Sequence, residues 1–468
     1  MIKPLSGTKP KPNPNKRRRK LARRVVVIGA NASGVEAASA ARKKDRTAEI
    51  TLITQEKNAG YSRCGLPFVI GGHIANFHDL IVYPPAYFQM LKLNLRTETK
   101  ATAINTKEKT VAVASKEGTT EVLSYDSLVI ATGADSFTPP LKGKEKQGIL
   151  SLRGIEDGEK IDAAVKAGAK SAVIMGAGLI GLEVGVGLIE RGLKVKIVEM
   201  LPQILPQLLD ADMAKLVQDH LQEKGMVILT SKGVEEFLGE EKVTAVVAGG
   251  EKIEADLFIS AFGVRASTKL AADAGIPLGE TRAIKTNGRM ETDVKDVYAV
   301  GDCAEAPNII THRPMCAQLG TIAVRQGKVA GANAGGDYSQ FSGVLASAVT
   351  RLFEIEAGNT GLTETSAARN RIEVVTGAIS SKTKADYFPG GKSIKVKLIV
   401  EKESQRIVGG QVVGGEEVTQ RINCLSFAIQ KGMTVRELAK ADTAYAPPLC
   451  ETWEPMVLAA EMVLMKLR

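Results

Sequence analysis

The chain has 468 residues, of which 44% are hydrophobic and 24% are charged. This length predicts about two to four domains, each large enough to bury a core. The composition is typical of a globular protein and excludes fibrous and wholly disordered classes. The most apolar window, residues 172–189, contains five glycines and Glu183, so it favours a strand, a turn and a helix over a membrane span. We therefore expect no stable membrane insertion.

The net charge of +10 comes from the N-terminal segment. Residues 1–24 hold ten Lys and Arg and no acid, which leaves 52 basic and 52 acidic residues in the remainder. The segment is also rich in Pro and Asn, so we predict a basic disordered tail over residues 1–24. Its simplest interpretation is a solvated extension. Weak contact with nucleic acid or an acidic surface is the alternative.

The five cysteines, at positions 64, 303, 316, 424 and 450, show neither a disulfide framework nor zinc-ligand spacing. No secretory signal peptide is visible. Together these features predict a reducing, cytoplasmic compartment and no metal site.

A glycine-rich turn follows the first expected strand, residues 25–28, and precedes an expected helix, residues 35–42. The first glycine permits a tight turn, and the last lets helix and strand pack closely. Backbone N–H groups at the helix start then face a pyrophosphate. The usual middle glycine is replaced by Asn or Ala, so this motif is weak by itself. The expected contacts come from Gly29, Asn31, Ala32, Ser33 and Gly34.

A second turn, Gly176, Gly178 and Gly181, matches the dinucleotide pattern fully and lies between a strand at 171–175 and a helix through residue 191. The next strand, 195–198, ends at Glu199, where a carboxylate can bond both ribose hydroxyls and would repel a 2′-phosphate. We therefore expect NADH, with NADPH the less favoured dinucleotide.

Two further strand ends carry ligand signals. The apolar strand 128–130 breaks at Ala131, Thr132 and Gly133, and the strand 297–300 is followed by Gly301 and Asp302. Ligands of open α/β sheets bind at such carboxyl ends. We expect Asp302 to hold a ribityl hydroxyl.

Cys64 lies in Tyr61–Phe68, about thirty residues after the first turn, and the next cysteine is Cys303. A dithiol–disulfide enzyme needs a resolving thiol a few residues away, and none stands there. A lone redox thiol must instead pair with a small substrate thiol, a sulfane sulfur, or oxygen as sulfenic acid.

These motifs, in the order in which they occur along the chain, resemble those of the single-cysteine pyridine nucleotide-disulfide oxidoreductase family. That family includes coenzyme A disulfide reductases, NAD(P)H-dependent persulfide and polysulfide reductases, and NADH oxidases and peroxidases. The resemblance covers residues 25–468. Besides the motifs above, it is carried by Gly263-Val264-Arg265, by Ala385 to Gly390 and by Ala444 to Pro448.

The resemblance implies an α/β fold with two Rossmann-like domains and a C-terminal α+β dimerisation domain. The FAD domain, residues 25–150 and 276–340, would be split by an NAD domain over 151–275. Residues 341–468 would form the homodimer. Within them we expect a helical stretch through residue 351, strands at 394–400 and 407–413, and helices at 418–431 and 455–467.

By the same resemblance, electrons pass from NADH through FAD to a mixed disulfide or persulfide on Cys64. The substrate would be CoA disulfide, CoA persulfide or polysulfide, with coenzyme A as substrate or bound ligand. Tyr445 of the other subunit, with Tyr387, would protonate the leaving thiolate; interface packing is the alternative for both. A helix N-terminus and Arg63 should lower the pKa of Cys64. Further cofactor contacts are expected at Arg63, Gly263, Leu319 and Gly320.

Two departures from the family pattern bear on function. Oxidases and peroxidases carry a histidine in the first turn where this chain has Ala32, which favours the disulfide and persulfide branch. The acid expected on the FAD adenosine ribose aligns with Thr54, and Glu56 lies two residues on. Cys450, close in sequence to Tyr445, could be a second thiol near the site. An NADH oxidase or peroxidase that uses a Cys64 sulfenic acid is one alternative, and a non-catalytic flavoprotein scaffold or sensor is another.

Overall fold

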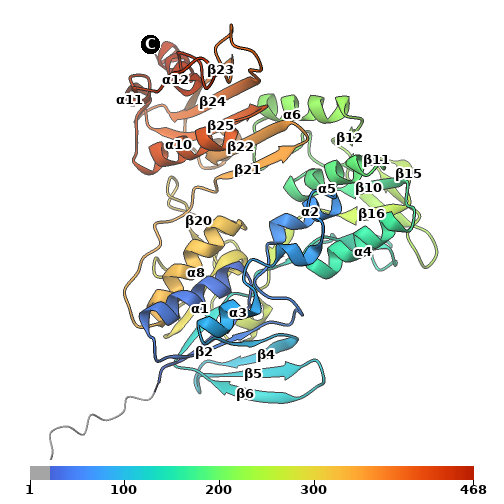
Figure 1. Ribbon diagram of the computed structural model, residues 1–468, viewed down its shortest axis with the longest axis vertical. Coiled ribbons are helices and arrows are strands. Elements are labelled where there is room, and N and C mark those ends of the chain that lie inside the picture. The colour runs from blue at the N-terminus through green and yellow to red at the C-terminus, as the bar shows by residue number, and fades with distance from the viewer. Residues whose placement is uncertain (1–21, 468) are drawn as a thin grey trace, which may run out of the picture.

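The computed structural model describes residues 22–467 and arranges them around three sheets (Figure 1). The predicted tail therefore lies outside the described residues, apart from its last three. The first sheet is parallel, in the order β18-β7-β1-β2-β3. Its strands are β1 (Arg24–Ile28), β2 (Glu49–Ile53), β3 (Asn94–Arg96), β7 (Ser127–Ile130) and β18 (Val297–Ala299). The inner strands are apolar on both faces, as a sheet covered on both sides requires.

Two long helices pack side by side against this sheet: α1 (Ala32–Lys44) and α8 (Gly320–Ala334) (Figure 1). Their backbones approach so closely that a Cβ on Gly331 would lie 2.0 Å from the Ala37 carbonyl oxygen. An antiparallel meander flanks the sheet: β4 (Thr99–Asn105), β5 (Thr110–Ser115) and β6 (Thr120–Ser124). The short helices α3 (Pro85–Met90) and α7 (Lys269–Asp273) complete this part, whereas α2 (Leu66–Ile70) packs against α4 (Ile155–Lys166) and α5 (Leu179–Glu190) of the next part of the fold.

The second sheet is also parallel, in the order β12-β11-β10-β16-β9. Its strands are β9 (Ile149–Ser151), β10 (Ser171–Met175), β11 (Lys194–Val198), β12 (Val227–Leu229) and β16 (Leu257–Ser260). It carries the helices α4 (Ile155–Lys166), α5 (Leu179–Glu190) and α6 (Ala211–Glu223) and the meander β13 (Val234–Leu238), β14 (Ala245–Ala248) and β15 (Glu251–Glu254). The chain enters and leaves this unit through an antiparallel pair, β8 (Ala134–Ser136) and β17 (Val264–Ala266).

The C-terminal part holds an antiparallel sheet in the order β21-β22-β25-β24-β23. Its strands are β21 (Ala348–Leu352), β22 (Ile355–Gly361), β23 (Val374–Lys382), β24 (Ser393–Glu401) and β25 (Ile407–Gly414). The helices are α9 (Glu364–Arg369), α10 (Val418–Gln430), α11 (Val435–Leu438) and α12 (Pro455–Lys466). A two-residue pair, β19 (Ala306–Pro307) and β20 (Pro314–Met315), lies between the first and third parts of the chain.

The predicted α/β class with two parallel sheets is confirmed, but the helical stretch expected over residues 341–351 is wrong. Gly343 and Ala346 adopt positive φ angles, of 103° and 56°, which a right-handed helix cannot contain. From residue 348 the chain forms β21, in which exposed Val349 and Arg351 alternate with buried Thr350 and Leu352. This alternation is the period of a strand with one face on the core. In the described part of the chain, no helix is long and apolar enough to cross a membrane.

Candidate functional site

Both glycine-rich turns, Cys64 and Asp302 line one continuous cavity of about 3040 Å³ between the two parallel sheets and the C-terminal part. Binding sites for single small ligands usually enclose about 300–1,000 Å³. The cavity is therefore large enough for two dinucleotides and a substrate. It lies at the carboxyl ends of the parallel strands, as the sequence predicted.

The first turn is a tight backbone cradle at the end of β1. Gly29 has a φ of 114°, and a Cβ there would lie 2.1 Å from the Ala131 carbonyl oxygen. A Cβ on Gly34 would lie 1.8 Å from the Gly29 oxygen. Both glycines are thus required by the turn itself. Asn31 occupies the N-cap position of α1 and lines the cavity, and its buried Oδ1 has no hydrogen-bond partner among the described residues.

The remaining residues expected around the first turn gather at the same end of the sheet. Ser33 lies behind Gly301, where a Cβ would come within 2.6 Å of the Ser33 Oγ. Thr132 donates to the Ser267 carbonyl at 2.7 Å, and Gly133 has a positive φ of 71°. All of the expected first-site positions except Gly34 and Gly301 line the cavity: Gly29, Asn31, Ala32, Ser33, Ala131, Thr132, Gly133, Asp302, Leu319 and Gly320. Leu319 and Gly320 begin α8, so the N–H groups of that helix face the cavity.

The prediction that Arg63 lowers the pKa of Cys64 needs a correction. Its guanidinium pairs instead with Glu56 at 2.5 Å and donates to the Arg153 carbonyl oxygen. The other oxygen of Glu56 accepts from the Tyr61 hydroxyl at 2.6 Å. Glu56, at the end of β2, is therefore held firmly in the cavity wall by two neighbours from the Cys64 segment.

The second turn repeats the cradle of the first at the end of β10. A Cβ on Gly176 would lie 2.3 Å from the Ala261 oxygen, and one on Gly181 would lie 2.1 Å from the Gly176 oxygen. A Cβ on Gly178, in contrast, would meet no protein atom within 4 Å. Gly178 thus leaves free space in the cavity, which is the requirement for close approach of a pyrophosphate. Gly263, with a φ of 110°, faces the same open space.

Glu199 lies directly after β11 and faces this turn. Its Oε2 accepts from the Ala177 N–H at 2.8 Å, and its Oε1 accepts from the Leu201 N–H at 2.9 Å. The carboxylate is therefore fixed before any ligand binds, in the position from which it can reach a ribose.

Cys64 lies in the short 3-10 turn η1 (Arg63–Gly65), directly before α2, and its side chain is exposed to the cavity. The expectation of a lowered pKa is not met. Burial by the surrounding protein, followed by the negative charges of Glu183 and Asp302, raises the pKa of the Cys64 thiol. The Arg153 guanidinium acts in the opposite direction and favours the thiolate.

Arg153 and Glu183 are the two charged residues at this site that sequence reasoning missed. Arg153 forms an ion pair with Asp302 at 2.8 Å, and both side chains line the cavity. Glu183, on α5, accepts from the Thr350 hydroxyl at 2.8 Å, and burial raises the pKa of its carboxyl. A glutamate two residues after the last glycine of the second turn was visible in the sequence. The position of Arg153 near Cys64 was not, because 89 residues separate them.

A second thiol, Cys316, also lines the cavity. Burial, with the charge of Asp302 next, raises its pKa to about 12. Its Sγ donates to the Asp302 carbonyl oxygen at 3.4 Å. Cys316 therefore stays protonated near neutral pH and is a poor nucleophile. All five cysteines are free in the structure.

Tyr387 and Tyr445 do meet, although 58 positions separate them. Their hydroxyls are 2.7 Å apart on the surface of the C-terminal part, and their segments are joined by a hydrogen bond from the Ala385 N–H to the Pro447 oxygen. Neither tyrosine lines the cavity of its own chain. Cys450 lies under the same turn and donates to the Ala444 oxygen at 3.3 Å.

These features fit a flavin dinucleotide at the first turn and a nicotinamide dinucleotide at the second. The glycine cradles admit a backbone-bound pyrophosphate, the unpartnered Asn31 oxygen faces the first, and the fixed Glu199 faces the second. Two such sites joined to an accessible thiol define a redox enzyme of the flavin- and nicotinamide-dependent class.

The particular family follows from comparison with known proteins. Residues 23–327 match the family described as "Pyridine nucleotide-disulphide oxidoreductase", and residues 347–457 match its dimerisation domain. The chain therefore belongs to the pyridine nucleotide-disulphide oxidoreductase family. This confirms the predicted recognition, and with it an oxidoreductase that uses FAD and NAD(H).

The similarity to individual relatives extends over most of this chain and most of theirs. A Methanocaldococcus jannaschii protein named NADH oxidase is 43% identical over 95% of this chain and 99% of its own. A Pyrococcus furiosus protein named NAD(P)H sulfur oxidoreductase (CoA-dependent) is 32% identical over 94% of this chain and 99% of its own. The solved structure of an NAD-dependent persulfide reductase from A. fulgidus superposes with a TM-score of 0.92 at 39% identity, covering 95% of this chain and 83% of that one.

Proposed function

We propose that this protein is an FAD-dependent oxidoreductase that passes electrons from NADH to a disulfide or persulfide held on Cys64. The observation that carries the proposal is the position of Cys64, an accessible thiol in the wall of the cavity that both glycine turns share. When bound at the first turn, FAD would supply two-electron chemistry between NADH and sulfur.

Residues of this chain would bind the two dinucleotides and act on the Cys64 thiol. Gly178 admits the pyrophosphate of NADH, and Glu199 bonds its ribose and disfavours a 2′-phosphate. Asp302, Thr132 and the N-terminus of α8 hold the flavin side. Arg153 favours the Cys64 thiolate and so opposes in part the burial and the charge of Glu183, which raise the pKa of the thiol.

The tyrosine pair would provide the proton for the departing thiolate. One hydroxyl of the pair donates to the other, so the accepting hydroxyl is held in place and keeps its own proton free to give. Because the pair lies outside the cavity of its own chain, we propose that it reaches the Cys64 site of a second copy in a homodimer. Exposed apolar side chains on the same surface, Leu449 and Trp453, support burial of this surface by a partner.

We propose a coenzyme A disulfide, a coenzyme A persulfide or a polysulfide as the substrate. A thiol that lacks a resolving partner must release its bound sulfur by reduction, and all three substrates satisfy that requirement. The name of the P. furiosus relative includes CoA dependence, and that of the A. fulgidus structure is persulfide reductase. The five free cysteines support a reducing, cytoplasmic setting.

The name of the M. jannaschii relative supports a second candidate, an NADH oxidase that cycles Cys64 through sulfenic acid. The cavity argues against it. None of the four histidines lines the large cavity, and Ala32 stands where a histidine would be needed to stabilise that chemistry.

The test measures NADH turnover by the FAD-loaded protein with different acceptors. CoA disulfide, CoA persulfide, polysulfide and hydrogen peroxide are compared without air, and oxygen is tested separately in air. We expect thiol or sulfide release that disappears in Cys64→Ser, while Cys316→Ser retains it. Turnover with peroxide or oxygen alone would overturn the proposal and favour the oxidase.

A further inference from the structure

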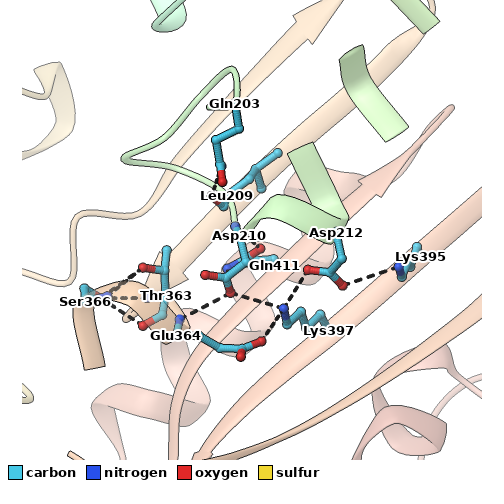
Figure 2. Close-up of polar contacts among 10 residues, drawn as sticks. All are labelled: Gln203, Leu209, Asp210, Asp212, Thr363, Glu364, Ser366, Lys395, Lys397 and Gln411. Atoms are coloured by element: carbon cyan, nitrogen blue, oxygen red, sulfur yellow. Dashed lines mark hydrogen bonds and ion pairs between the residues drawn. The ribbon is translucent and has the colours of Figure 1, made fainter. Parts of the chain in front are cut away.

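An ionic cluster with a buried centre joins the second sheet's unit to the C-terminal part (Figure 2). Asp210 and Asp212 come from the start of α6, Lys397 from β24, Gln411 from β25 and Glu364 from the start of α9. We call these five residues the Lys397 cluster. Lys397, Asp210 and Gln411 are 4%, 6% and 0% exposed, so their polar groups are satisfied by one another and not by solvent.

Lys397 is the centre of the cluster. Its Nζ lies 2.7 Å from Asp212 Oδ1 and 3.3 Å from Asp210 Oδ2, and it also contacts the Glu364 carboxylate. Burial opposes the lysine's charge, but its hydrogen bonds to Asp212 and Glu364 raise the pKa of Lys397. Lys397 is therefore charged at neutral pH, and removing it would leave the buried Asp210 carboxylate without a counter-charge.

Asp210 occupies the N-cap position of α6 but does not cap it. An aspartate there normally accepts from the second or third N–H of its own helix. Here the carboxylate makes no such bond. Its Oδ2 accepts instead from Gln411 Nε2 at 2.7 Å and from the Glu364 N–H at 3.2 Å, and the Asp210 N–H donates to Gln411 Oε1 at 2.9 Å. The side chain is thus directed to the C-terminal part.

Asp210 directly follows segment 200–209, which packs against the second glycine turn. The Leu205 N–H donates to the Ala177 oxygen at 2.9 Å, while Glu199 accepts from the N–H groups of Ala177 and Leu201. Leu201, Leu205 and Leu208 all line the large cavity beside Gly178. The segment therefore forms one wall of the proposed NADH site.

The segment is held in a conformation that it would not adopt alone. Leu205 has a φ of 48°, a left-handed conformation that is unfavourable for a branched apolar residue and persists only where the surroundings impose it. Gln203 Nε2 donates to the Leu209 oxygen at 2.8 Å (Figure 2). The N–H groups of Leu208 and Leu209 donate to the Leu205 oxygen. The fixed end of the segment is Asp210.

We infer that Lys397, Gln411 and Asp210 are positioning residues that hold segment 200–209 against the second glycine turn and so set the affinity for NADH. The inference rests on the proposed function, because it requires NADH at that turn. By this inference the C-terminal part, which carries the tyrosine pair, would set the affinity for the dinucleotide in addition to forming the proposed dimer contact.

The test compares Lys397→Met with Lys395→Met in the FAD-loaded protein. Lys395 lies two residues away on β24 and contacts only Asp212, at 3.4 Å, so it is a matched control. Calorimetric titration gives the Kd of NAD⁺, and steady-state rates give the KM for NADH and for the sulfur acceptor. We expect Lys397→Met to raise the Kd and the KM for NADH by about three- to thirtyfold, in the range of mutations that modulate coupling. The KM for the acceptor should stay unchanged, and Lys397→Arg should restore most of the affinity.

Amide hydrogen exchange provides a second readout that a purely structural role would not move. Exchange at Leu205 and Leu208 should be faster in Lys397→Met than in Lys395→Met. Where Lys397→Met does not fold, Gln411→Met replaces it, since it removes two hydrogen bonds to Asp210 and leaves every ion pair in place.

The outcomes separate this inference from the proposed function. A variant that is less stable but binds NAD⁺ and exchanges Leu205 as the control does would overturn the inference alone. A wild-type protein that does not bind NAD⁺ would overturn the proposed function and the inference with it.

Discussion

Replacing Gly178 with alanine should weaken NADH binding and leave the fold intact. The added Cβ would meet no protein atom within 4 Å, and the φ and ψ of Gly178, −80° and −175°, are open to any residue. The methyl group would project into the cavity beside the second turn. It would therefore meet the pyrophosphate of a bound dinucleotide and no part of the protein.

The stability effect can be worked out from two opposed contributions. Alanine is a poorer N-cap than glycine, by about 0.5–1 kcal/mol. Alanine also reduces the entropy of the unfolded chain, which stabilises the fold by about 0.4–1 kcal/mol. The free energy of unfolding should thus change by less than about 0.5 kcal/mol. A substrate displaced by about 1 Å can lose on the order of a hundredfold in rate, so we expect kcat/KM for NADH to fall about ten- to hundredfold.

Urea unfolding and NADH-dependent turnover measure the two effects separately. Gly288→Ala is the matched control, because a Cβ there also meets nothing within 4 Å and Gly288 does not line the cavity. Gly181→Ala should instead destabilise the protein, since its Cβ would lie 2.1 Å from the Gly176 oxygen. If Gly178→Ala and Gly288→Ala bind NADH with equal affinity, the pyrophosphate does not approach this turn.

Three further predictions concern charge and protonation. Glu183→Gln should shift alkylation of Cys64 by iodoacetamide to lower pH, because Glu183 is one cause of the raised thiol pKa and its removal favours the thiolate; Glu190→Gln on the same helix should leave the profile in place. Tyr387→Phe and Tyr445→Phe should each slow acceptor turnover without changing the rate of flavin reduction by NADH, measured by stopped flow, and an effect on flavin reduction instead would refute proton donation. Arg421→Met should cost about 3–5 kcal/mol in urea unfolding, because it leaves the buried Glu454 carboxylate unpaired. Lys402→Met, which breaks an exposed pair with Glu373, should cost less than about 1 kcal/mol, and equal losses would contradict this reasoning.

The glycine turns could be predicted from sequence because their requirements are local. Gly29, Gly34, Gly176 and Gly181 are fixed by carbonyl oxygens of their own turn or of the adjacent strand end. The order of turn, cysteine and aspartate then located the cavity and its chemistry. The cofactor roles of the individual residues stay predictions until a ligand is measured.

Features that depend on contacts between distant segments were missed. Arg63 was expected beside Cys64 because it is adjacent in sequence, but its guanidinium pairs with Glu56, and Arg153 arrives from another part of the chain. The helix expected before residue 351 is a strand because β21 pairs with β22. The Lys397 cluster joins residues that are up to 201 positions apart, and no local pattern indicates that the Asp210 side chain leaves its own helix uncapped.

The most direct measurement of the central claim is the mass of the Cys64 peptide after the protein, with its cysteines as free thiols and its FAD oxidised, is treated with CoA disulfide. Because no resolving thiol stands beside Cys64, we expect one CoA per chain as a mixed disulfide on Cys64, absent in Cys64→Ser and released by anaerobic NADH. A Cys64 that takes up no CoA, persulfide or polysulfide sulfur but is oxidised to sulfenic acid by peroxide and restored by NADH would contradict the claim and establish the oxidase chemistry.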